Sequence, residues 1–229
     1  MTEKPDQTND SNRNPKPKGA KIQTLRILII EPSNRYCRNV WCAIFNGLSH
    51  VLIGAVVMTA LFYSLVKNDL HASLCAFGFH FFAAEAILSL NYANGWSTPL
   101  RLRHRRFAHV FLQICGLTCV FIGTVVIVTS KGVSGRVHGV ASLAATLLAC
   151  FTFLVGPWAL LKGRYLKLLH TTFGIPTFIM SSISLCSGLY ESDFMNWSGS
   201  AVVFILTGFI IFYTSFIVAS SFIKCMMRI

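Results

Sequence analysis

The sequence predicts an all-α membrane protein with six transmembrane helices, as its composition and the placement of its charges indicate. Of its 229 residues, 54% are hydrophobic and only 12% are charged, whereas soluble domains contain about 25% charged residues. The charged residues lie in clusters between long uncharged stretches. A helix needs roughly 20 apolar residues to cross the hydrocarbon core, and each stretch is long enough. A single soluble domain is therefore not expected.

Net charge and cysteine content exclude two further classes of protein. The net charge is +12, but the basic residues lie between apolar segments, so no nucleic-acid partner is expected. The eight cysteines mostly lie inside apolar runs, which is not typical of a secreted disulfide framework. The lipid bilayer is the partner that this composition indicates.

The uncharged stretches place the six helices, which short connections make antiparallel. Residues 39–223 form the expected membrane domain, preceded by a mobile basic tail at 1–38 and followed by a short C-terminus at 224–229. Within the membrane domain, the predicted helices are 41–65, 71–93, 108–130, 138–161, 169–190 and 198–222.

Lysine and arginine counts predict the orientation in the membrane. Seventeen of these residues fall in the two termini and the second and fourth connections, and three fall on the other side. Because cytosolic segments carry the excess of basic residues, both termini are expected in the cytosol. We expect the endoplasmic reticulum or an endosomal vesicle rather than the plasma membrane.

Four histidines, His71, His109, His138 and His170, begin four consecutive helices. Since the helices alternate in direction, His71 and His138 share the outer level, and His109 and His170 share the cytosolic level. Two facing imidazoles at one depth suit a six-coordinate haem. Zinc would need two further ligands at the same level, and histidines at helix starts can also be simple interfacial residues.

Small residues follow these histidines on the same helix face, because seven residues are about two turns. The positions seven and fourteen residues after each histidine hold Gly78, Gly116, Ala145, Thr177, Glu85, Gly123, Thr152 and Ser184. A flat macrocycle beside a helix needs such a cleared face. Close packing between membrane helices explains the same pattern.

The histidine segments resemble the cytochrome b561 family of ascorbate-dependent transmembrane reductases. The similar segments are Phe82-Ala-Ala-Glu85, His109-Val-Phe-Leu-Gln113, Arg136-Val-His138-Gly139 and Leu169-His170-Thr-Thr-Phe-Gly174. The resemblance covers about residues 41–222, and Ser49-His50 is closest to the short single-domain branch. It implies a central four-helix bundle that holds two b-type haems, with iron ligated by His71 and His138 and by His109 and His170.

The same resemblance implies electron transfer from cytosolic ascorbate to an outer acceptor, either monodehydroascorbate or ferric iron. Cations near the cytosolic histidines are candidates to attract the ascorbate anion, and Arg164 is preferred because the family places an ascorbate-contacting arginine there. These candidates are Arg103, Arg105, Arg106, Arg164 and Lys167, with Lys131 and Arg136 for the outer acceptor. Positive-inside topology alone also explains the cytosolic cations.

Three polar residues inside helices complete the candidate set. Glu85 lies fourteen residues after His71, so we expect it near the inner haem, bonded to a ligand histidine or paired with a loop arginine. His50 is a candidate to support a ligand or to be buried and neutral. His80 is expected to face away and to bond between helices. A histidine-lined metal-ion or proton transporter is the alternative function, and a homodimer is possible.

Overall fold

The computed structural model describes residues 33–161 and 163–226, and all regular structure in these ranges is helical. Six helices are long and apolar enough to cross a membrane. The predicted fold class, an all-α protein with six spans, is confirmed at this level. Of the predicted tail at 1–38, residues 1–32 lie outside the described residues, as do the last three residues of the chain, whereas 33–38 form the start of the first helix.

The six spans follow the predicted order, and the second span is built from three consecutive helical segments. Several helices begin before their predicted starts, because hydropathy marks the lipid-facing part of a helix while its hydrogen bonding continues into the polar boundary. The elements are α1 (Ser33–Lys67), α2 (Leu70–Cys75), η1 (Ala76–Ala83), α3 (Ala84–Ser89), α4 (Leu102–Lys131), α5 (Val137–Leu161), α6 (Gly163–Leu189), α7 (Ser192–Ser198) and α8 (Ser200–Met226).

The connection between α1 and α2 shows how short links make neighbouring helices antiparallel. Asn68 adopts a left-handed conformation with φ 53°, which asparagine tolerates better than most residues. The Asp69 side chain then accepts a hydrogen bond from the Ala72 amide at 3.3 Å and caps α2. Two residues therefore suffice to reverse the chain between the first two spans.

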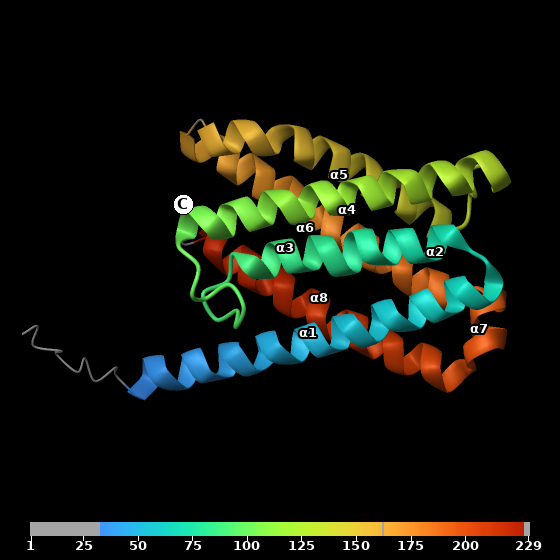
Figure 1. Ribbon diagram of the computed structural model, residues 1–229, viewed down its shortest axis with the longest axis horizontal. Coiled ribbons are helices and arrows are strands. Elements are labelled where there is room, and N and C mark those ends of the chain that lie inside the picture. Colours follow the sequence, from blue (N-terminus) through green and yellow to red (C-terminus); the bar gives the residue numbers. More distant parts are fainter. Residues whose placement is uncertain (1–32, 162, 227–229) are drawn as a thin grey trace, which may run out of the picture.

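The second span lies at the centre of the bundle. Half of its most apolar window is buried, compared with 33% or less for the other spans. In Figure 1, α4 and α5 lie on one side of the second span and α1 on the other, while α6 passes behind it. We call the end where α1 begins and α8 ends the basic end, because it also holds the segment 90–101 and the start of α4. The opposite end holds α7.

The middle of the second span, η1, is a π-helix of eight residues. A π-helix closes hydrogen bonds over five residues rather than four, so it holds an extra residue compared with an α-helix. This shifts the face that every later residue of the span presents. The sequence analysis did not predict this segment, and it did not predict α7.

Many large apolar side chains on the outside of the bundle are exposed, which would be unfavourable if this surface faced water. Phe121, Leu147 and Leu154 are 56%, 63% and 68% exposed, respectively. Contiguous apolar surface of this kind is typical of helices that contact lipid. The chain is therefore an integral multi-pass membrane protein.

Candidate functional site

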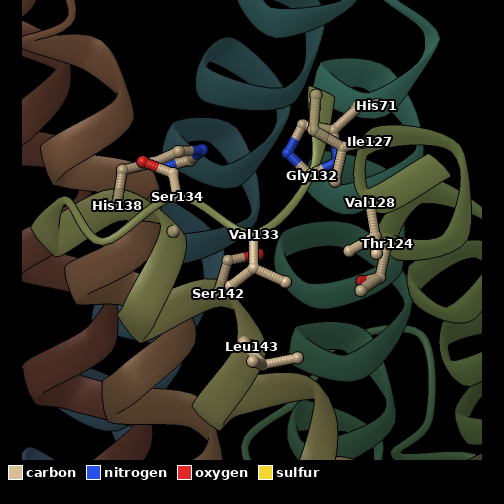
Figure 2. A pocket seen from close by; sticks show the side chains of 11 residues that line it. His71, Thr124, Ile127, Val128, Gly132, Val133, Ser134, His138, Ser142 and Leu143 are labelled. Atoms are coloured by element: carbon tan, nitrogen blue, oxygen red, sulfur yellow. The ribbon is translucent and has the colours of Figure 1, made fainter. Parts of the chain in front are cut away.

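The four histidines that begin consecutive spans meet in two pairs, one near each end of the bundle. The ring centres of His71 and His138 are 6.0 Å apart at the opposite end. Those of His109 and His170 are 6.3 Å apart at the basic end. The two rings of each pair are nearly perpendicular, at 80° and 81°. Figure 2 shows His71 and His138 pointing toward each other from α2 and α5.

Each of the four imidazoles is held through Nδ1 by a backbone carbonyl. The pairs are His71 with Gly123 (3.0 Å), His109 with Ala86 (2.8 Å), His138 with Ser184 (2.9 Å) and His170 with Thr152 (3.0 Å). A carbonyl only accepts hydrogen bonds, so Nδ1 must carry the hydrogen and Nε2 keeps its lone pair. A neutral imidazole oriented in this way is the form that ligates a metal.

These bonds cross between helices in a regular pattern. Gly123 lies fourteen residues after His109, Thr152 fourteen after His138, and Ser184 fourteen after His170. Each helix therefore begins with one histidine and, near its other end, supplies the carbonyl that holds the histidine of a neighbouring helix. The small residues predicted at this spacing supply the carbonyl oxygens that accept these hydrogen bonds, and a small side chain leaves room for the imidazole to approach.

The second span departs from this spacing by one residue. Its carbonyl comes from Ala86, fifteen residues after His71, and not from Glu85. The extra residue of the π-helix η1 explains the shift. The expectation that Glu85 shares the face of His71 is therefore wrong, because it assumed an uninterrupted α-helix.

Gly78 and Gly116 have a different role from the one that a macrocycle would give them. A Cβ on Gly116 would lie 2.8 Å from the carbonyl oxygen of Gly78 and 3.3 Å from Cβ of Phe82. A Cβ on Gly78 would likewise lie 2.8 Å from the carbonyl oxygen of Gly116. The two glycines are small because η1 and α4 touch there, so the helix-packing explanation holds for this pair.

Gly188 is a site residue that the sequence analysis missed. A Cβ at this position would lie 3.0 Å from both Nδ1 and Cε1 of His138. The imidazole of His138 therefore rests on the bare backbone of α6, beside the carbonyl of Ser184 that holds it. The signal in the sequence was weak, since a glycine in a membrane helix is common.

The paired histidines fit haem better than they fit zinc. Metal–nitrogen bonds of about 2 Å on each side, plus about 1 Å from each nitrogen to its ring centre, would separate two axial imidazoles by about 6 Å. The measured separations of 6.0 and 6.3 Å match this value. Within residues 33–161 and 163–226, no cluster of three or more His, Cys, Asp or Glu side chains could hold a metal ion, so a tetrahedral zinc site lacks ligands.

A small pocket of about 70 Å³ opens between the histidines of the opposite end. Figure 2 shows Thr124 and Val128 of α4, Ser142 and Leu143 of α5, and the connection at Gly132–Ser134 around it. Of the two cations predicted here, Lys131 is exposed in the last turn of α4. Arg136 is also exposed and forms an ion pair with Glu191, with 2.7 Å between Nη1 and Oε2.

The predicted cations of the basic end divide into exposed and buried side chains. Arg103, Arg106 and Lys167 are exposed in the first turns of α4 and α6. Arg105 is only 6% exposed. Its guanidinium donates to the carbonyl oxygens of Thr98 and Leu100 at 2.8 and 3.1 Å. These bonds hold the segment 90–101 against the start of α4. The side chain of Arg164 lies outside the described part of the structure.

Glu85 pairs with His50, a partner that the sequence analysis did not foresee. Its Oε1 lies 2.5 Å from Nδ1 of His50, and its Oε2 accepts a hydrogen bond from Nε1 of Trp96 at 3.1 Å. The expected bonds to a ligand histidine or a loop arginine are therefore not the ones found. The extra residue in η1 directs Glu85 toward α1, whereas Ala86 faces His109.

His80 faces away from both histidine pairs, and its predicted role as an interhelical hydrogen-bonding residue is confirmed. Tyr213 Oη lies 2.8 Å from its Nδ1, and its Nε2 lies 3.3 Å from the carbonyl oxygen of Ser181. The side chain is 1% exposed and joins the second span to α6 and α8. His104 is exposed in the first turn of α4.

Comparison with known proteins identifies relatives of this bundle. A family model described as eukaryotic cytochrome b561 matches residues 70–196. Transmembrane reductase CYB561D2 of Mus musculus is 29% identical over 136 residues, which are 53% of this chain and 60% of that protein. CYB561D2 of Homo sapiens is 29% identical over 134 residues, 52% and 59% of the two chains. No solved structure matches the chain significantly.

The chain thus spans about three fifths of the length of the curated relatives that it matches. The segment matched by the family model contains more than half of the chain and all four facing histidines, His71, His109, His138 and His170. It also contains Arg164, which lies six residues before His170 in α6. The chain belongs to the cytochrome b561 family.

Proposed function

We propose that the chain is a transmembrane reductase that moves single electrons from cytosolic ascorbate to an acceptor across the membrane. Two b-type haems would be held by His71 with His138 and by His109 with His170. Membership of the cytochrome b561 family implies haem, and the two matched relatives carry the name transmembrane reductase. The acceptor is monodehydroascorbate or ferric iron, and a homodimer in an endoplasmic reticulum or endosomal membrane is the proposed setting.

One observation carries the proposal. In each of the two pairs the two imidazoles face each other, and every Nδ1 is bonded to a backbone carbonyl. The bonds fix the orientation of the rings, and they leave all four Nε2 atoms as available ligands. A bis-histidine haem b supplies one-electron chemistry without an open coordination position for the substrate. Because the pairs lie at different levels, two haems held by them would form two successive electron-transfer sites across the membrane.

The cations of the basic end would attract the donor. Ascorbate is a monoanion at neutral pH, and the exposed Arg103, Arg106 and Lys167, with Arg164, would raise its local concentration beside His109 and His170. Arg105 is a weaker candidate, since its guanidinium already binds loop carbonyls. At the opposite end, Lys131 and Arg136 would attract the acceptor. The excess of basic residues at the basic end supports this orientation, because cytosolic segments of membrane proteins are enriched in lysine and arginine.

The absorption spectrum of the purified, detergent-solubilised protein tests the proposal. We expect b-type haem bands, about two haem irons per chain, and reduction of these bands by ascorbate. Zinc without iron, or a spectrum with no haem, would favour the alternative of a metal-ion or proton transporter. Haem that dithionite reduces and ascorbate does not would retain the electron-transfer protein but reject ascorbate as its donor.

A further inference from the structure

A partly buried polar cluster lies at the basic end, where α1 and α3 meet the segment 90–101. It is formed by His50 and Glu85, with Asn46, Asn94 and Trp96 as their hydrogen-bonding partners. Polar side chains within membrane spans are costly, and by default they indicate function. The proposed electron route passes through the paired histidines and leaves this cluster without a role.

Glu85 has the surroundings of an ionised carboxylate. Its Oε2 accepts from Nε1 of Trp96 at 3.1 Å. Its Oε1 lies 2.5 Å from Nδ1 of His50, which donates in the tautomer whose Nε2 accepts from Asn46. A protonated carboxyl would need an acceptor on one oxygen. The side chains of His50 and Glu85 remain 26% and 13% exposed, so the pair is not sealed inside the bundle.

The other nitrogen of His50 has a partner in either protonation state. Nε2 lies 3.2 Å from the amide nitrogen of Asn46 and 3.3 Å from the amide oxygen of Asn94. A neutral ring accepts from Asn46, whereas a protonated ring donates to Asn94. Both asparagines are almost fully buried, at 1% and 0% exposed. The cluster can therefore gain or lose one proton without leaving Nε2 unpaired.

This proton site is closely connected to the histidine pair of the basic end. Glu85 precedes Ala86, whose carbonyl oxygen accepts the Nδ1 hydrogen of His109 at 2.8 Å. The Glu85 side chain is therefore attached to the residue next to the one whose carbonyl holds a proposed haem ligand, in surroundings where charges interact more strongly than in water.

The neighbouring charged groups are already engaged. Arg105 of α4 binds loop carbonyls and lies under the ring of Tyr92, with its Cζ 5.1 Å from the ring centre. Lys224 of α8 donates to the carbonyl oxygen of Leu90 at 3.4 Å. Within the described ranges, His50 is thus the group of this cluster suited to change its charge.

We propose that His50, positioned by Glu85, takes up one proton at Nε2 for each electron that reaches the His109–His170 site. The inference rests on the proposed function. The ascorbate monoanion loses one electron to that site, and its hydroxyl O–H bond breaks. The proton passes through water at the basic end and forms an N–H bond at Nε2. The added negative and positive charges then balance, so the low-dielectric interior stores no net charge.

Reduction potentials measured against pH test this assignment on the purified haem-loaded protein. The haem whose signal is lost in His170→Ala is followed by spectroelectrochemical titration. In the unmodified protein, we expect its potential to fall by up to about 59 mV for each tenfold decrease in proton concentration. Glu85→Gln and His50→Gln should flatten this dependence. Asp193→Asn, the same acid-to-amide change at the opposite end, should leave it unaltered.

A potential that does not depend on pH in the unmodified protein would overturn the inference, while haem binding and ascorbate reduction would leave the proposed function standing. A dependence that persists in both variants would also overturn it, because another group must then carry the proton. If Glu85→Gln loses haem, Asn94→Leu answers the same question. That change removes the acceptor of the protonated ring, so the dependence must move to lower pH, and an unmoved dependence excludes His50.

Discussion

Gly78 of η1 and Gly116 of α4 pack backbone against backbone, and a Cβ on either would lie 2.8 Å from the carbonyl oxygen of the other. Two of the four histidine–carbonyl bonds, from His71 to Gly123 and from His109 to Ala86, cross this same interface. The contact between the glycines therefore sets the distance over which both bonds form.

Gly116→Leu should consequently lower the haem content of both sites and not of the His109 site alone. Forcing a large side chain into a packed contact costs about 1–3 kcal/mol, and separating η1 from α4 lengthens both histidine–carbonyl bonds. Haem content and thermal unfolding of the purified variant measure the effect. Val125→Leu is the control, because Val125 is 44% exposed. Selective loss of the His109 haem would indicate that porphyrin, not helix packing, requires the glycine.

His170→Ala should remove one haem and leave the other. The two histidine pairs are held by separate sets of carbonyl bonds, so the His71–His138 site should keep its ligands. We expect about half of the haem, with the remaining spectrum still bis-histidine. Pyridine haemochrome assay and iron analysis provide the count. Loss of all haem without loss of membrane insertion would mean that the sites assemble together.

Gly188→Ala should disturb the haem of the opposite end alone. The new methyl group would lie 3.0 Å from Nδ1 of His138 and displace the ring from its bond to Ser184. Glycine to alanine otherwise stabilises a helix by about 1 kcal/mol. Gly208→Ala, where a Cβ meets nothing within 4 Å, should therefore be neutral or stabilising. Equal haem spectra in the two variants would show that His138 does not need the bare backbone.

Arg164→Ala should slow reduction by ascorbate more than reduction by dithionite. Arg164 lies in the first turn of α6, six residues before His170, and attraction of an anion to a cationic entrance raises association rates by about tenfold or more at low salt. Stopped-flow reduction at two ionic strengths measures the difference. If both reductants slow equally, Arg164 supports folding or topology and not ascorbate.

The six spans and the pairing of the histidines could be predicted because both depend on long-range regularities of the sequence. Apolar length fixes the spans, and alternating direction brings His71 level with His138 and His109 level with His170. The partner of Glu85 could not be predicted in this way. Its direction depends on one extra residue in η1, and a π-helix has no composition that distinguishes it from an α-helix.

The short helix α7 and the role of Gly188 were missed for different reasons. α7 has only seven residues, too few for a periodic pattern, and it is ordered by its contact with α1, where the ring centres of Phe194 and Tyr63 are 5.0 Å apart. Gly188 acquires its role only when His138 from another helix lies against it. Contacts between distant segments decide both features.

The π-helix η1 divides the second span into two parts that can change independently during evolution. The part before it presents His71 to His138, and the part after it presents Glu85 to α1 and Ala86 to His109. Removing one residue from η1 would restore a regular α-helix while leaving both flanking parts facing as they do now. In a family alignment, a single-residue gap within 76–83 would therefore leave His71 and Glu85 aligned with residues that face the same way in other members. A gap elsewhere in the span would not.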